Sequence, residues 1–363
     1  MKALLPVICL LPRLPPVIDG VGDYALNLAR QLREDFNIET RFVVGDPDWV
    51  GKTDIEGFTI SQVVDHSAKA LLSLLPSGYQ SSTPVLLHYV GYGYAKRGCP
   101  VWLVKGLEHW KSRTIDARLV TMFHEVYASG PPWTSSFWLS PLQRDLAAHL
   151  ARLSDRCLTS KQLYAELLYK LNPKNCSQIP VLPVFSTVGE PTQVLSLAER
   201  SPQLVVFGGR ASRIRVYQDS ATTLVKVCQS LGIKKILDIG PPTGLNLSLM
   251  KEVTILEKGA LPVSEISHIL SHSLVGFLAY APDFLAKSTI FAAYCAHGVL
   301  PINSDESGRS ADGIEAGKYY WTPDTTNIPL RDLTAMQAIA DNAYSWYQTH
   351  TLKAQAKVFA ELV

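Results

Sequence analysis

The sequence lacks the features that mark several large classes of protein. No apolar run reaches the ~18 residues that a membrane-spanning helix needs. Lysine plus arginine (34) and aspartate plus glutamate (32) nearly balance, and the formal net charge of +2 excludes a chain built mainly to coat nucleic acid. The 6 cysteines stand singly, with no CxxC pair and no Cys/His cluster at zinc spacing. We therefore expect free thiols in a reducing cytosol and no metal site.

Common catalytic and nucleotide-binding signatures are missing as well. The sequence contains no GxGxxG with a distal acid, no Walker A loop and no nucleophile elbow. Its apolar start carries prolines and a single early charge but no small-residue cleavage site, which favours a buried first strand over a signal peptide. We therefore predict a cytoplasmic protein, and the sequence leaves open that it lies at the periphery of a membrane.

The sequence does contain short apolar strands that alternate with amphipathic helices, typical of parallel sheets with helices on both faces. The 363 residues are about twice a usual domain, and a proline-rich stretch at 179–202 separates two such series. We predict an α/β fold with an N-terminal domain at 1–190, a second domain at 191–332 and a helical segment at 333–363. The predicted strands cover residues 3–11, 40–44, 85–89, 118–123, 204–207, 235–239, 253–256, 274–278 and 299–302.

The loop that follows the first predicted strand is rich in glycine. Gly20 and Gly22 would let the backbone approach a ligand at the positive end of the next helix, and Asp23 fits as the cap of that helix. A routine capped turn is the structural alternative.

Histidines stand at the ends of two predicted strands of the first half. His88 precedes a Gly/Tyr loop, and His124-Glu125 follows a buried strand, where parallel sheets place their ligands. His124 could serve as acid, base or hydrogen-bond donor, and Glu125 could hold it or bind substrate. The alternative is a set of structural side chains.

In the second half, two strand-to-helix segments carry groups suited to phosphate. Arginine forks match phosphate oxygens, glycines permit close approach, and a helix start attracts anions. Gly209 is predicted to be a loop residue that lets the backbone approach the ligand. The predicted phosphate-binding residues are Arg210, Arg213, Arg215, Lys287, Ser288 and Thr289.

An aromatic segment at 130–141 contains Trp133, Phe137 and Trp138. Three interpretations stay open: a loop that recognises an acceptor, a wedge at a membrane surface, and ordinary packing against the next helix.

Four stretches, at 20–29, 123–127, 207–210 and 296–302, together resemble retaining GT-B glycosyltransferases of the glycosyltransferase group 1 (GT4) type, in that family's order. The resemblance implies two Rossmann-like doubly wound domains that face a central cleft, an acceptor-side N-terminal domain, a nucleotide-sugar domain, and a C-terminal helix that crosses back. It implies transfer of a sugar from a nucleotide sugar to a glycosyl acceptor with retention. It adds no further cofactor or metal.

Residue by residue, the resemblance assigns His124 as the active-site histidine. It assigns Arg210, with Arg213 or Arg215, to the donor pyrophosphate. Asp283 stands where the first glutamate of the E-x7-E element belongs, and the resemblance implies a catalytic role for that carboxylate, in contact with the transferred sugar. Phe291 replaces the second glutamate, which in the family usually binds the nucleotide ribose. Phe291→Glu is therefore expected to tighten nucleotide binding if that position points at the site. The alternative function is a catalytically degenerate GT-B scaffold that binds a ligand or partner.

Overall fold

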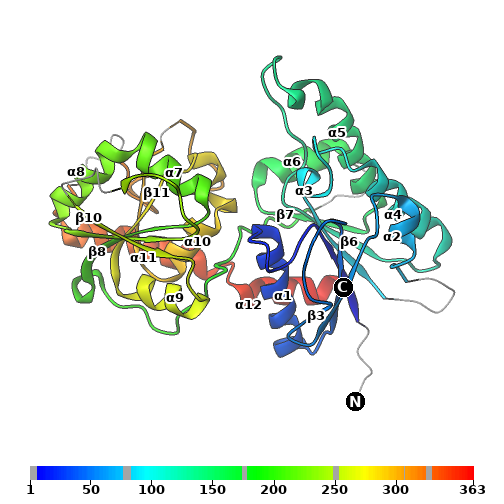
Figure 1. The fold of residues 1–363 in the computed structure, drawn as a ribbon, viewed down its shortest axis with the longest axis horizontal. Coiled ribbons are helices and arrows are strands. Elements are labelled where there is room, and N and C mark those ends of the chain that lie inside the picture. Colours follow the sequence, from blue (N-terminus) through cyan, green and yellow to red (C-terminus); the bar gives the residue numbers. More distant parts are fainter. Residues whose placement is uncertain (1–5, 77–82, 174–177, 248–252, 306, 324–328) are drawn as a thin grey trace. The chain divides into compact units, whose positions relative to one another are not determined.

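The computed structural model describes residues 6–76, 83–173, 178–247, 253–305, 307–323 and 329–363 (Figure 1). The chain forms two compact units. Met1–Pro183 and Leu352–Val363 make up the first unit, and Val184–Thr351 make up the second. The unit boundaries thus differ from the predicted ones at 190 and 332.

A seven-stranded sheet runs through the first unit in the order β3-β4-β2-β1-β5-β6-β7. Neighbouring strands are parallel except for β3 with β4. Every residue of β1, β5 and β6 is buried, as expected for central parallel strands covered on both faces. The strands are β1 (Val7–Leu11), β2 (Thr40–Val44), β3 (Asp54–Ile55), β4 (Phe58–Gln62), β5 (Val85–Tyr89), β6 (Leu119–Phe123) and β7 (Arg156–Thr159).

Helices cover both faces of this sheet. The side chains of β1 alternate between two apolar clusters: Ile8 and Leu10 pack in the one that α4 joins, Cys9 and Leu11 in the one that α1 joins. The last helix of the chain, α12, packs against α1 (Figure 1). The helices are α1 (Gly20–Phe36), α2 (Ala68–Leu72), α3 (Gly91–Tyr94), α4 (Val101–Arg113), α5 (Ser135–Leu153), α6 (Gln162–Leu171) and α12 (Leu352–Leu362).

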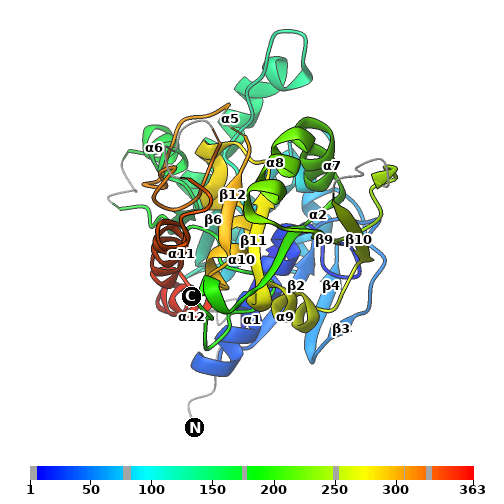
Figure 2. The same ribbon diagram turned by 90° about the vertical axis from the view of Figure 1, so that its left-hand side faces the viewer.

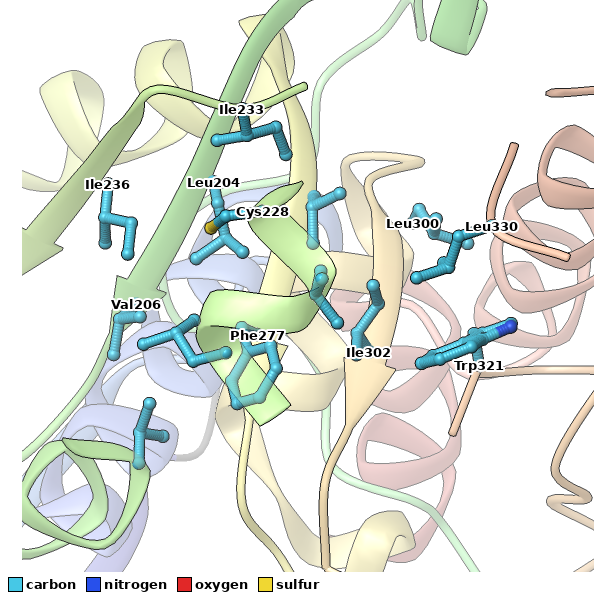
Figure 3. Packing of buried hydrophobic residues seen from close by; sticks show 14 of the residues in the cluster. Leu204, Val206, Cys228, Ile233, Ile236, Phe277, Leu300, Ile302, Trp321 and Leu330 are labelled. Atoms are coloured by element: carbon cyan, nitrogen blue, oxygen red, sulfur yellow. The ribbon is translucent and has the colours of Figure 1, made fainter. Parts of the chain in front are cut away.

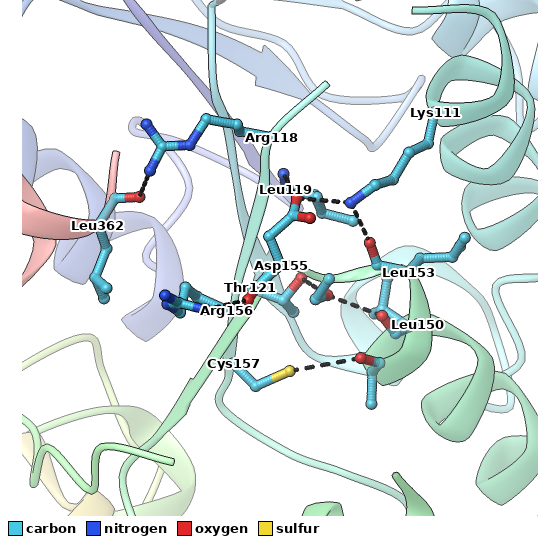
Figure 4. Close-up of polar contacts among 12 residues, drawn as sticks. Lys111, Arg118, Leu119, Thr121, Leu150, Leu153, Asp155, Arg156, Cys157 and Leu362 are labelled. Carbon is cyan, nitrogen blue, oxygen red and sulfur yellow. Dashed lines mark hydrogen bonds and ion pairs between the residues drawn. The ribbon is translucent and has the colours of Figure 1, made fainter. Parts of the chain in front are cut away.

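One carboxylate ties the starts of β6 and β7 to the helices beside them. Asp155 accepts a hydrogen bond from the backbone N–H of Leu119 at 2.7 Å and pairs with Lys111 Nζ at 2.6 Å (Figure 4). Arg118 donates to the backbone carbonyl of Leu362 in α12 at 3.2 Å. These contacts lie at the amino ends of the strands, so they fix the edge of the sheet opposite to the strands' carboxyl ends.

The second unit holds a parallel five-stranded sheet in the order β10-β9-β8-β11-β12 (Figure 2). Its strands are β8 (Ser201–Phe207), β9 (Lys235–Ile239), β10 (Thr254–Gly259), β11 (Ser273–Leu278) and β12 (Leu300–Asn303). Its helices are α7 (Arg210–Asp219), α8 (Ala221–Leu231), α9 (Val263–His272), α10 (Thr289–Ala296) and α11 (Leu333–Gln348), with 3-10 turns η1 (Leu197–Glu199) and η3 (Pro282–Lys287).

The core of the second unit explains why α10 is apolar on all sides. One face of the sheet contributes Leu204, Phe277 and Ile302 to a cluster shared with α8 and α11 (Figure 3). The other face receives α10, whose Tyr294 ring fills the place that a side chain at Gly276 would occupy. Because α10 is buried all round, its sequence shows no polar stripe.

The predicted α/β class with parallel sheets is confirmed. Among the helices that the structure describes, none is long and apolar enough to cross a bilayer.

Candidate functional site

Two histidines meet at the carboxyl edge of the first sheet. His88 lies in β5, and the backbone N–H of His124, just after β6, donates to the carbonyl of Tyr89 at 2.9 Å. This pairing sets His88 Nδ1 3.0 Å from His124 Nε2, with the rings inclined by only 24°. Both side chains are buried. The sequence placed both residues at strand ends but did not predict that they bond to each other.

Tyr24 of α1 completes this cluster. Its ring stands edge-on to His88 and His124, with centroids 5.6 Å and 5.1 Å away. Its hydroxyl donates to Oε1 of Gln355 in α12, and Gln355 Nε2 in turn donates to the carbonyl of Pro183 at 2.6 Å. The sequence analysis covered Tyr24 only as part of the stretch 20–29 and did not single out Gln355, because 331 positions separate the two residues.

The protonation state of His88 follows from its burial. Burial lowers the pKa of His88 to about 3, so this imidazole is neutral at physiological pH. Its Nε2 has no hydrogen-bond partner among the residues that the structure describes. Glu125, next to His124, is partly exposed at the same edge.

The turn between β1 and α1 is capped by Asp19, not by Asp23 as predicted. The Asp19 carboxylate accepts from the backbone N–H groups of Val21 and Gly22 at 2.9 Å and 3.0 Å. A side chain at Gly22 would meet the carbonyl of Arg13 at 2.3 Å, so this glycine is required by the chain's own backbone. Gly20 faces open space.

In the second unit, the predicted arginine loop is a helix. Gly209 is the N-cap of α7, and Arg210 is its first residue. Gly209 carries no side chain that could cap the helix, and the space beside its Cα is open. Arg210 is exposed and donates through Nε to the carbonyl of Thr243 at 3.1 Å, which holds it over the turn after β9.

Arg213 does not fit the predicted phosphate-binding role, because its guanidinium is buried and bonded on every nitrogen. Nε donates to the carbonyl of Gly208 at 3.1 Å, Nη1 pairs with Asp238, and Nη2 bonds the carbonyl of Pro241. Tyr217 donates to the other oxygen of Asp238 at 2.8 Å. Arg213 therefore joins the turns after β8 and β9.

Arg215 is exposed on a different face of α7. Five residues after Arg210, it lies about 140° round the helix axis from it. The structure thus brings the three predicted arginines onto one helix but points them in three directions.

The start of α10 lies beside the start of α7. A side chain at Gly208 would meet Cδ1 of Ile290 at 2.5 Å, so the two helix starts are in contact. A small cavity of about 10 Å³ lies here, lined by residues of β8, α7, β11 and α10: Val206, Phe207, Ser212, Arg213, Val216, Phe277, Leu278, Ala279, Tyr280 and Ile290.

The predicted residues at the start of α10 have different surroundings. Ser288 is buried and caps the helix by accepting from the backbone N–H of Phe291 at 3.2 Å. Lys287, partly exposed, lies 5.8 Å from the centre of the Phe284 ring, and Thr289 is partly exposed as the first helical residue. Asp283, in η3, lies against the backbone of Gly308.

Phe291 points into the core. The condition for tighter nucleotide binding by Phe291→Glu, that this position faces the site, is therefore not met. Its side chain is fully buried, with its ring 5.5 Å from that of Trp346 and 6.3 Å from that of Tyr320. The position does not face the open space at the helix starts.

Comparison with known proteins shows the fold. No family model and no curated protein sequence matches the chain. One similar solved structure is the pneumococcal O-GlcNAc transferase GtfA in complex with UDP and GlcNAc, with 10% sequence identity and a TM-score of 0.60 over 99% of this chain and 98% of that one. A second is WaaG, a glycosyltransferase involved in lipopolysaccharide biosynthesis, with 11% identity and a TM-score of 0.55 over 98% of this chain and 99% of that one. A third is the trehalose 6-phosphate synthase from Burkholderia multivorans, with 11% identity and a TM-score of 0.59 over 99% of this chain and 96% of that one. At this identity the likeness concerns architecture, and it confirms the predicted GT-B fold.

Proposed function

We propose that this protein is a glycosyltransferase that moves a sugar from a nucleotide sugar to a glycosyl acceptor, with retention. Its GT-B fold is similar to that of the transferases named above. The observation that carries the proposal is the uncapped start of α7, with Arg210 beside it, at the carboxyl edge of the second sheet.

The donor diphosphate would bind at this helix start. The first backbone N–H groups of α7 lack a side-chain acceptor from Gly209 and can donate to phosphate oxygens. Arg210 would add a charge-assisted bond worth ~1.5–3 kcal/mol. Lys287 and Thr289 would extend the site from α10, since Gly208 and Ile290 hold the two helix starts together. Stabilising the leaving diphosphate would be their share of catalysis.

Arg213 would not contact the diphosphate but would help to position Arg210. By joining the turns after β8 and β9, it fixes the surface over which Arg210 lies. Arg215 would add only a distant positive charge. Asp283 keeps the role that the resemblance implies, contact with the transferred sugar.

In the first unit, His124 would orient the sugar or the acceptor by a hydrogen bond. One proton occupies the contact between His88 Nδ1 and His124 Nε2. We assign it to His88, because the alternative leaves an unbonded N–H on the buried Nε2 of His88, and orphaned buried donors are rare. His124 would then accept at Nε2 and carry its own proton on Nδ1, with Glu125 beside it at the edge of the sheet.

A calorimetric titration of UDP, GDP and ADP tests the proposal. One of them should bind the wild type, and Arg210→Ala should weaken it roughly ten- to a hundredfold. Arg331→Ala removes an exposed arginine elsewhere in the same unit and serves as the matched control, with unchanged affinity. Absence of binding to all three nucleotides would favour the non-catalytic scaffold, and equal affinity in the three proteins would remove the diphosphate from α7.

A further inference from the structure

An exposed apolar tip projects from the first unit. It consists of the segment before α5 and the first turns of α5, which extend beyond the rest of that unit (Figures 1 and 2). Trp133 is 84% exposed and Trp138 71% exposed, and Phe137 and Leu142 are exposed beside them. Large aromatic side chains in water lose the stabilisation that burial would give, so a cluster of them indicates a surface that something covers.

The tip is held in this exposed form by its own hydrogen bonds. Trp138 Nε1 donates to the carbonyl of Pro132 at 2.8 Å, and Thr134 Oγ1 donates to the carbonyl of Pro131 at 2.7 Å. The hydroxyls of Thr134 and Ser136 lie 2.9 Å apart. These bonds fix the aromatic rings outward, and they occupy polar groups that could otherwise bind a polar ligand.

The charge pattern around the tip selects its partner. Residues 126–143 contain no charged side chain. At the base, Gln143 donates to the carbonyl of Arg97 at 2.8 Å and accepts from the N–H of Ala128, which places the exposed Lys96 and Arg97 next to the tip. The neighbouring Arg144 and Asp145 offset each other. An uncharged aromatic tip with two positively charged side chains next to it matches the interface of an anionic bilayer. There, tryptophan enters the headgroup region, and lysine and arginine contact lipid phosphates.

We propose that this tip docks the protein on anionic membrane surfaces, with Trp133, Phe137, Trp138 and Leu142 inserted and Lys96 and Arg97 on the headgroups. The docking does not depend on the proposed transferase activity, so each can fail without the other. A sugar-recognition loop fits less well, because such sites need hydrogen-bonding groups beside the ring, and those of Trp138, Thr134 and Ser136 are bonded within the tip.

Co-sedimentation of the full chain with vesicles tests this proposal. The wild type should bind vesicles of phosphatidylcholine with 30% phosphatidylglycerol, and Trp133→Ser/Trp138→Ser should lower the bound fraction roughly tenfold or more at fixed lipid. The matched control is Leu163→Ser/Tyr169→Ser, which removes two exposed apolar side chains from α6 of the same unit and should bind as the wild type does. All of these side chains are exposed, so unchanged melting temperatures verify that the variants fold.

The electrostatic part has a separate readout. Lys96→Gln/Arg97→Gln should weaken binding to the anionic vesicles roughly tenfold or more, and 0.5 M salt should reduce this difference. Vesicle binding equal in wild type and tryptophan variant, or lost equally in the α6 control, overturns the proposal. So does a wild-type dimer, seen by sedimentation velocity, that the tryptophan variant dissolves, because that result assigns the tip to a second copy of the chain.

Discussion

At the scale of single residues, buried charge decides which arginine can serve a ligand. Arg213 and Asp238 are almost fully buried and paired with each other, and burial raises the pKa of the Asp238 carboxyl despite its arginine partner. Such a pair stabilises little by itself, but removing one partner leaves a buried charge uncompensated. Arg213 thus holds together the turns after β8 and β9, and Arg210 remains exposed at the start of α7.

This predicts a specific pattern of stability. Arg213→Met should lower the free energy of unfolding by about 3–5 kcal/mol, whereas Arg213→Met/Asp238→Leu should recover much of that loss. Arg215 is exposed and lies about half a turn round α7 from Arg213. The free energy of unfolding of Arg215→Met should therefore stay within about 0.5 kcal/mol of that of the wild type. Urea unfolding of the three variants measures this, and an equal loss for Arg213→Met and Arg215→Met would contradict the buried role.

Asp23 gives a second residue-scale prediction, on pH. Burial, together with the Asp19 carboxylate, raises its pKa from 3.8 to about 6. The ionised form is therefore disfavoured in the fold, and it lowers stability above pH 6. That cost disappears as pH falls from 6 to 4, because the folded protein binds the proton first.

Asp23→Asn should therefore be more stable than the wild type by about 1–3 kcal/mol at pH 7. The difference should shrink through pH 6 to 4 and vanish below about pH 4. Thermal melting of both proteins from pH 3.5 to 8 checks the sign. A constant difference across that range would show that the carboxyl does not titrate near 6 in the fold.

At the scale of elements, the strands were predictable and the Arg-rich segment was not. Central parallel strands such as β5 (Val85–Tyr89) and β9 (Lys235–Ile239) have the predicted bounds, because a strand covered on both faces is mostly apolar. The sequence analysis did not predict β7, which has only four residues. It also missed the pair β3 and β4 at the edge of the sheet, in which several residues are partly or fully exposed. Short edge strands carry too little periodicity to separate them from loops.

The segment after β8 was taken for a loop because of its two glycines. Only Gly208 has a positive φ, at 134°, and from Arg210 onward no glycine or proline interrupts a helix. A helix that begins so early rotates successive arginines apart, and Arg213 becomes internal. Its partner Asp238 lies in β9, 25 positions further along the chain, so the local sequence pattern could not predict this pairing.

Phe291 provides an element-scale prediction. Because α10 is buried all round, Phe291→Glu places a carboxylate among Trp346 and Tyr320 instead of at a ribose. We expect a loss of about 4 kcal/mol or more in stability and no gain in nucleotide affinity. Phe291→Leu, which keeps the site apolar, should cost far less. A stable Phe291→Glu variant with tighter nucleotide binding would show that this side chain turns toward the ligand.

At the scale of the whole molecule, the chain returns to its first unit at the end. The predicted helical segment 333–363 is divided in the structure: α11 belongs to the second unit and α12 to the first. Within the first unit, α12 buries Ala356 and Phe359 completely and supplies Gln355 to Tyr24. The last eleven helical residues therefore complete the surroundings of the histidine pair.

Ending the chain after Thr351 should consequently damage the first unit alone. Loss of the Phe359 contacts corresponds to about 3–5 kcal/mol, and the buried Tyr24 hydroxyl loses its acceptor at a further cost of about 1–3 kcal/mol. Hydrogen exchange resolved by peptide should become faster in α1 and β1 and stay unchanged in β8 and β11. Lys353→Ala, which removes only an exposed lysine paired with Asp35 at 3.7 Å, should exchange as the wild type does. Faster exchange confined to the second unit after truncation would instead assign α12 to that unit, and the Tyr24–Gln355 bond would then have no part in holding the histidines.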